Sequence, residues 1–142
     1  MEKIVKEKYT IAVIEDEEVM SKSLAGELED AGFAVIKAFD GETGLALVLK
    51  EKPDLVLLDI IMPKMDGITM MKKLRESGEF GQRAAIILLT NLNADDHIMS
   101  GITKNEPSYY LVKSSYTLED LVAKVRVCLQ GNNPSSITHG NS

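Results

Sequence analysis

The stretch LVLLDIIMPKMDG, from Leu55 to Gly67, decides how this chain folds. Residues 55–58 are all apolar, without the polar alternation of a half-exposed strand, which is typical of a strand covered on both faces in a parallel sheet. Such a strand cannot hold a charge in its middle, so Asp59 is expected at its carboxyl end. Open α/β sheets place their ligand crevices at that edge. Asp59 is therefore either a functional carboxylate or simply the polar residue that ends the strand.

The composition is that of an ordinary soluble globular chain with material for one domain. Of its 142 residues, 44% are hydrophobic and 27% are charged, and the formal net charge is −6. A surface of that sign repels a phosphate backbone, so direct nucleic-acid binding is not expected. The single cysteine, Cys128, cannot form an internal disulfide. The charged start MEKIVKEKYT has no apolar run long enough for a signal peptide or a membrane span, so we expect a cytoplasmic protein without membrane contact.

Strand and helix patterns alternate along the whole chain. Strands are predicted at residues 9–14, 33–38, 55–58, 84–89 and 109–112. Helices are predicted at residues 17–31 with Gly32 as the stop, at 42–51, between Asp66 as a cap and Gly78 as the end, at 94–104, and at 118–129. This alternation, with apolar central strands, predicts an α/β fold with a parallel sheet and helices on both faces.

Polar side chains stand where these strands end. Glu15 and Asp16 follow the first strand, Asp59 the third, Thr90 the fourth and Lys113 the fifth. The carboxyl ends of parallel strands meet at one edge, so these side chains are expected to converge there. Three neighbouring carboxylates repel one another unless a cation neutralises them. Oxygen ligands without nearby Cys or His favour a hard cation, and a site of few carboxylates that also accepts a phosphate oxygen suits Mg²⁺.

With these residues in place, the sequence resembles the receiver domain of two-component response regulators across essentially all of residues 9–129. The resemblance rests on four segments: IAVIEDE for the acidic pair, LVLLDIIMPKMDG for the phosphoacceptor strand and its loop, IILLT for a hydroxyl position, and YLVKS for a lysine. It implies a doubly wound, flavodoxin-like (βα)5 fold, with a five-stranded parallel sheet in strand order 2-1-3-4-5. Residues 1–8 would then be an N-terminal extension and residues 130–142 a polar tail or linker.

The resemblance also implies the roles of the strand-end residues. Asp59 would accept a phosphoryl group from a histidine kinase or a phosphotransfer protein. Asp16, Asp59 and the backbone carbonyl of Ile61 would hold Mg²⁺, and Glu15 would act through a metal-bound water. The chain would be a phosphoacceptor signalling domain rather than an enzyme, with only self-catalysed phosphotransfer and slow autodephosphorylation of its own.

Three further residues have implied roles: Lys113 and Thr90 would act with Asp59 in catalysis, and Thr90 and Tyr110 would form the switch. Lys113 would pair with the phosphoryl oxygens, Thr90 would hydrogen-bond one of them, and Tyr110 would be the aromatic side chain that changes rotamer. Their movement would alter the surface near the fourth helix and fifth strand and so control a downstream protein partner. Two positions depart from the family pattern: Ser114 follows the lysine where proline is usual, and Asn91 follows Thr90 where a small residue is usual.

Three other classes of protein share part of this sequence pattern. A haloacid dehalogenase type phosphatase also uses a strand-end aspartate, but it needs a second aspartate two residues on, where this chain has Ile61. A nucleotide or flavin protein needs a glycine- or hydroxyl-rich loop after the first strand, where this chain has EDEEVMS. A pseudo-receiver, which keeps the fold as an interaction module without phosphorylation, stays open as the alternative. With only a polar tail after residue 129, a stand-alone receiver is expected.

Overall fold

The computed structural model of the chain describes residues 8–90, 109–112 and 116–131. From residue 8 to residue 90, strands and helices alternate as the sequence predicted, apart from one additional short helix before the fourth strand. The strands are β1 (Thr10–Ile14), β2 (Ala34–Ala38), β3 (Leu55–Asp59), β4 (Ile86–Thr90) and β5 (Tyr109–Val112). The helices are α1 (Glu18–Asp30), α2 (Gly41–Glu51), α3 (Gly67–Arg75), α4 (Glu79–Arg83) and α6 (Leu118–Gly131).

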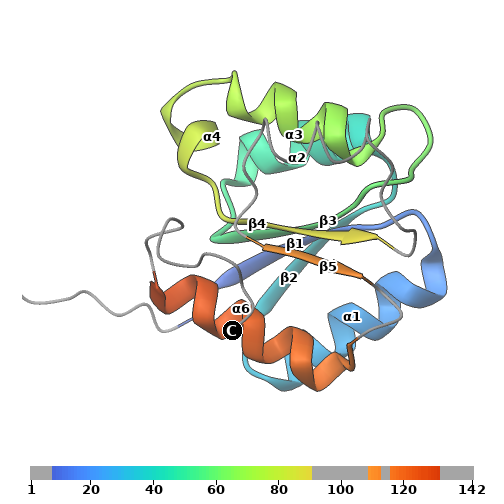
Figure 1. The fold of residues 1–142 in the computed structure, drawn as a ribbon, viewed down its shortest axis with the longest axis vertical. Helices are drawn as coiled ribbons and strands as arrows, with labels where there is room; N and C mark the ends of the chain where they lie inside the picture. The colour runs from blue at the N-terminus through green and yellow to red at the C-terminus, as the bar shows by residue number, and fades with distance from the viewer. Residues whose placement is uncertain (1–7, 91–108, 113–115, 132–142) are drawn as a thin grey trace, which may run out of the picture.

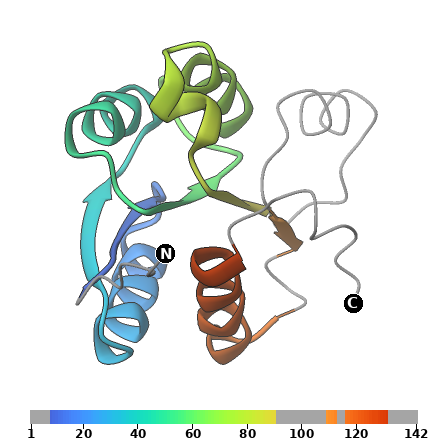
Figure 2. The same ribbon diagram turned by 90° about the vertical axis from the view of Figure 1, so that its left-hand side faces the viewer.

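The strands form one parallel sheet in the order β2-β1-β3-β4-β5, which confirms the predicted fold and strand order. Helices α2 and α3 cover one face of the sheet, and α1 and α6 cover the other (Figures 1 and 2). The order in which strands are added to the sheet reverses at β1, because β2 lies on one side of β1 and β3 lies on the other. Such a switch point opens a crevice at the carboxyl ends of the strands.

Strand β3 is covered on both faces, as its sequence indicated, and all five of its residues are buried. Alternate side chains along the strand enter two separate cores. The core beneath α2 and α3 includes Val56, Leu58, Met70, Met71 and Leu74. The core beneath α1 and α6 includes Leu55, Leu57, Leu24, Leu28, Leu121 and Val125. Met70 and Met71 therefore fill the core.

The predicted helix ends are largely confirmed. Asp66 caps α3, since its Oδ1 accepts a hydrogen bond from the backbone N–H of Thr69 at 2.8 Å. After α1, Gly32 has a φ of +98° and its N–H bonds to the carbonyl of Glu29, while the N–H of Phe33 bonds to the carbonyl of Leu28. This pair of bonds is the Schellman motif that a glycine commonly closes.

The region after α3 differs from the prediction. The sequence assigned Gly78 to the end of the third helix, but α3 ends at Arg75 and Gly78 precedes the unpredicted short helix α4. The Arg75 side chain stabilises this turn by donating to the carbonyls of Gly81 and Ala84, each at 2.8 Å. Ala84 is thereby kept out of β4, which begins two residues later than predicted and extends to Thr90. The predicted helix at 94–104 lies outside the described residues.

None of the helices in the described ranges is both long enough and apolar enough to span a membrane.

Candidate functional site

The pairing of the strands aligns their carboxyl ends. Ile14 lies opposite Leu58, so Glu15 follows β1 at the level where Asp59 ends β3. On the other side of β3, Asp59 lies opposite Leu89, one residue before the end of β4. The sequence therefore folds so that the acidic end of β1 and the acidic end of β3 meet at one edge of the sheet.

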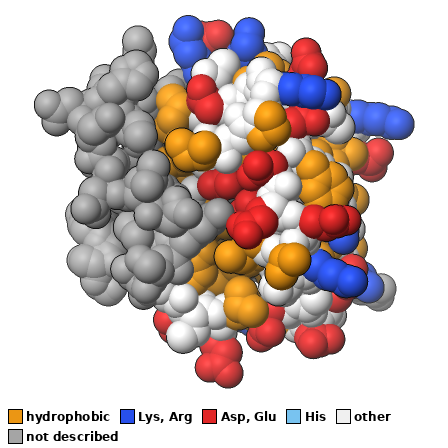
Figure 3. All heavy atoms as spheres, turned by 90° about the vertical axis from the view of Figure 1, so that its right-hand side faces the viewer, with side chains coloured by type: hydrophobic (Ala, Val, Ile, Leu, Met, Phe, Trp, Pro, Cys, Tyr) orange, Lys and Arg blue, Asp and Glu red, His pale blue; other side chains and the backbone are white. Residues whose placement is uncertain are grey.

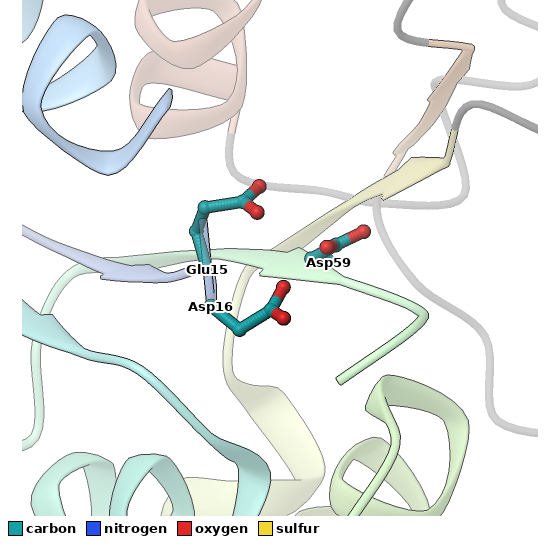
Figure 4. A group of neighbouring side chains, drawn as sticks. All are labelled: Glu15, Asp16 and Asp59. Atoms are coloured by element: carbon teal, nitrogen blue, oxygen red, sulfur yellow. The ribbon is translucent and has the colours of Figure 1, made fainter. Parts of the chain in front are cut away.

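Three carboxylates come together at this edge. One carboxylate oxygen from each of Glu15, Asp16 and Asp59 lies within 4.8 Å of the other two. Their side chains leave the ends of two neighbouring strands and extend toward the same side (Figure 4). Glu15 and Asp59 are only 1% and 5% exposed, whereas Asp16 is exposed to solvent. Two carboxylates of the cluster are thus buried, and the third is exposed to solvent.

The donor chemistry of this cluster fits a hard divalent cation. All three side chains offer oxygen, and a small number of carboxylates with room for water is the usual protein contribution to Mg²⁺ binding. A bound cation also relieves the repulsion between negative groups held this close. The backbone at the start of α1 orients Glu15, because its Oε2 accepts a hydrogen bond from the N–H of Glu17 at 3.1 Å.

The loop between β3 and α3 borders the cluster. It is closed at its base, where the N–H of Gly67 bonds to the carbonyl of Ile60 at 2.7 Å. A Cβ at Gly67 would overlap the carbonyl oxygen of Asp59, so α3 can begin this close to β3 only with glycine at that position. Ile61, two residues after Asp59 in the chain, is 53% exposed.

The middle of this loop is a strained turn. The N–H of Met65 bonds to the carbonyl of Pro63 at 2.7 Å, which closes a γ-turn around Lys64, whose φ is +67°. A non-glycine residue in this region costs of order 1–3 kcal/mol and persists only where its surroundings hold it. Two contacts from the start of α2 do so: Gly41 packs directly against the backbone of Met65, and Asp40 Oδ2 lies 4.0 Å from Lys64 Nζ.

Asp40 also caps α2, since its Oδ1 accepts a hydrogen bond from the backbone N–H of Thr43 at 2.7 Å. This hydrogen bond holds the pKa of Asp40 below its ordinary value, and the charge of Lys64 acts in the same direction. Asp40 is therefore an anion that both caps α2 and pairs with Lys64 in the β3–α3 loop.

The predicted switch residues are placed by their backbones. Thr90 is the last residue of β4 and lies opposite Val112, the last residue of β5. Tyr110 lies within β5 opposite Leu88. Lys113 lies outside the described residues. The predicted roles of Thr90, Tyr110 and Lys113 stay predictions.

The face that carries the strand ends is strongly acidic at its centre. Figure 3 views the molecule from the side toward which β4 points in Figure 1, and acidic side chains gather near the middle of that face among apolar ones. The sequence predicted the site carboxylates Glu15, Asp16 and Asp59, but it gave no sign that Asp40 and Gly41 contact the β3–α3 loop. The signal available was the pair Asp-Gly before a helix, which does not reveal that the helix contacts a loop more than 20 residues further on.

Comparisons with known proteins agree on one family. A family model described as the response regulator receiver domain matches residues 11–126. The transcriptional regulatory protein DltR of Streptococcus agalactiae is 32% identical over 117 residues, which cover 82% of this chain and 50% of DltR. The response regulator MprA of Mycolicibacterium vanbaalenii is 30% identical over 124 residues, which cover 87% of this chain and 52% of MprA. The chain thus spans about half the length of these curated relatives.

Solved structures give the same result. The BeF3-activated N-terminal receiver domain of Klebsiella pneumoniae RstA superposes with a TM-score of 0.75 at 30% identity, covering 85% of this chain and 98% of that one. The receiver domain of the Francisella response regulator 1452 has a TM-score of 0.77 at 24% identity, covering 88% of this chain and 99% of that one, and supports the fold alone.

Proposed function

This chain belongs to the family of response regulator receiver domains, and we propose that it accepts a phosphoryl group on Asp59 in a Mg²⁺-dependent reaction. The observation that carries the proposal is that Glu15, Asp16 and Asp59 each bring one carboxylate oxygen within 4.8 Å of the other two at the carboxyl edge of the sheet. Residues 9–129 would form the receiver, with residues 1–8 as an extension and 130–142 as a tail or linker.

Asp59 is the best placed nucleophile of the three. It ends β3, the strand that is buried along its whole length, and its backbone is fixed by Gly67 on one side and by pairing with β4 on the other. In the proposed step, a carboxylate oxygen of Asp59 bonds to the phosphorus of a phosphohistidine. The phosphorus–nitrogen bond breaks, and the imidazole leaves with the electron pair of that bond.

Asp16, Asp59 and the backbone carbonyl of Ile61 would hold Mg²⁺, with Glu15 acting through a bound water. When bound, the cation supplies positive charge that offsets the negative charge on the transferring oxygens. The residues of this chain supply the geometry: fixed strands hold Glu15 and Asp59, and the exposed Asp16 leaves one side open for the donor. Positioning of this kind accounts for most of the catalysis of phosphoryl transfer.

Phosphorylation would add about one negative charge and three acceptor oxygens at Asp59. We propose that Thr90 and Lys113 move toward these oxygens and that Tyr110 changes rotamer, which would alter the surface at the end of β5. The partners would be a histidine kinase or phosphotransfer protein upstream and a protein downstream. Because Ile61 carries no group that hydrogen-bonds water, autodephosphorylation is expected to be slow.

The test is phosphorylation by acetyl phosphate, followed by intact-mass measurement. The wild type should gain one phosphoryl group with Mg²⁺ and none with a chelator present. Asp59→Asn should gain none, while Asp54→Asn, a matched change before the same strand, should be labelled like the wild type. Labelling of Asp59→Asn equal to that of the wild type would refute the proposal, and an unlabelled wild type would favour the pseudo-receiver.

A further inference from the structure

The first turn of α2 contacts both segments that would supply metal ligands. On one side, Gly44 lies so close to β1 that an added Cβ would be 2.7 Å from Ile14 Cγ2, and Ile14 directly precedes Glu15. On the other side, Gly41 lies against Met65 in the β3–α3 loop, where an added Cβ would overlap the Met65 carbonyl oxygen and be 2.7 Å from its carbon. Both contacts are too close for any larger residue.

We propose that Asp40 and Gly41 are positioning residues for the magnesium site, because they contact the middle of the β3–α3 loop, and this loop carries the Ile61 carbonyl that would bind the ion. This inference rests on the proposed function. The γ-turn around Lys64 is strained and needs support. Gly41 supports it sterically, and Asp40 supports it through the ion pair with Lys64.

The effect of a larger residue at Gly41 depends on whether helix α2 or the β3–α3 loop moves to accommodate it. Helix α2 has little room to shift toward the sheet, because Gly44 already lies close to Ile14 of β1 and Met70 of α3. The base of the loop is fixed by the bond from Gly67 to Ile60. A methyl group at Gly41 must therefore displace the middle of the loop, which carries Ile61 with it. Changes in residues that orient metal ligands commonly weaken metal affinity by about 10–100-fold.

The experiment compares Mg²⁺ dissociation constants, measured by calorimetric titration of metal-free protein, for the wild type, Gly41→Ala and Gly81→Ala. Gly81 is the matched control, because its added Cβ would likewise overlap a backbone carbonyl, that of Leu74, but in α4 before the amino end of β4. Gly41→Ala should weaken binding by about tenfold or more. Gly81→Ala should melt at a lower temperature and yet bind Mg²⁺ like the wild type.

A second variant keeps the inference testable if Gly41→Ala does not fold. Asp40→Ala removes the cap and the ion pair while leaving Gly41 in place, and it should weaken Mg²⁺ binding several-fold. If the wild type binds Mg²⁺ and a folded variant, Gly41→Ala or Asp40→Ala, binds it with the same affinity, this inference is overturned and the proposed function is not. Absence of binding by the wild type would overturn the proposed function as well.

Discussion

Replacing Asp16 with asparagine should stabilise the metal-free protein and at the same time remove most of its stabilisation by Mg²⁺. Asp16 is the exposed member of the cluster, and its carboxylate lies within 4.8 Å of those of Glu15 and Asp59. Asparagine keeps the shape of the side chain but removes the charge. The substitution therefore isolates the electrostatic cost of holding three carboxylates together.

The size of the effect follows from the distance. Two unit charges 4.8 Å apart repel by about 0.9 kcal/mol in water and about 3.5 kcal/mol at an effective dielectric constant of about 20. Because Asp16 is exposed, the lower value applies to each of its two pairs, and salt screens part of it. We expect the free energy of unfolding to rise by about 1 kcal/mol, which corresponds to a melting temperature higher by about 4 °C.

Magnesium should reverse the order of the two proteins. At ten times its dissociation constant, a ligand that binds only the folded state stabilises it by about 1.4 kcal/mol, or about 6 °C here. The wild type should show this rise, and Asp16→Asn should show little of it. The assay is thermal unfolding followed by circular dichroism, with and without Mg²⁺. Glu29→Gln is the control, because it changes the net charge equally at an exposed position of α1 and should keep the full rise.

Two results would refute this reasoning. A metal-free Asp16→Asn that melts below the wild type would mean that the Asp16 carboxylate is not repelled in the folded protein. An unchanged rise with Mg²⁺ in Asp16→Asn would place the ion elsewhere.

Four further predictions concern three single side chains. The Ser21 hydroxyl is buried and has no hydrogen-bond partner among the described residues, so Ser21→Ala should leave the free energy of unfolding in urea unchanged or raise it by up to about 1 kcal/mol. A loss of more than about 1 kcal/mol would show that the hydroxyl makes a stabilising contact. Burial raises the pKa of Cys128 to about 12 from the ordinary 9.0, so the native thiol should react slowly with Ellman's reagent at pH 8, and rapid labelling of native protein would be inconsistent with this. The unfolded chain loses the thiol proton first, so this residue's contribution to stability should be complete below pH 9 and should fall as the pH rises toward 12. Finally, Ile61→Asn places a water-binding side chain two residues after Asp59, so the phosphorylated variant should lose its phosphoryl group faster than the wild type. The assay is a time series of intact-mass measurements. Equal rates would mean that water placement at residue 61 does not limit the rate of dephosphorylation.

The sequence was enough to predict the sheet and its acidic edge, because both depend on local patterns. The apolar run of β3 with Asp59 at its end identified a buried parallel strand, and the carboxyl ends of parallel strands must meet. The convergence of Glu15 and Asp16 with Asp59 follows from the same rule. Strand β5 was predicted at its observed bounds because its apolar run is short and ends in polar residues.

Features that depend on contacts between distant residues were not predictable. Helix α4 has too few residues to show an apolar period, and it is held by Arg75 through backbone carbonyls, which leave no pattern in the sequence. The support of the β3–α3 loop by Gly41 is equally hidden, because a glycine before a helix is also an ordinary turn residue. Sequence patterns report which face a residue buries but not which backbone it touches.

The most direct test of the central claim is to locate the phosphoryl group itself. An aspartyl phosphate is an acyl phosphate, and borohydride reduces it to an alcohol, which leaves homoserine at the modified position. Protein treated with acetyl phosphate and Mg²⁺, then reduced and digested, should yield the peptide that contains LVLLDIIMPK with homoserine in place of Asp59. Homoserine at Asp16, or at no position in protein whose intact mass shows a phosphoryl group, would contradict the assignment of Asp59 as the phosphoacceptor.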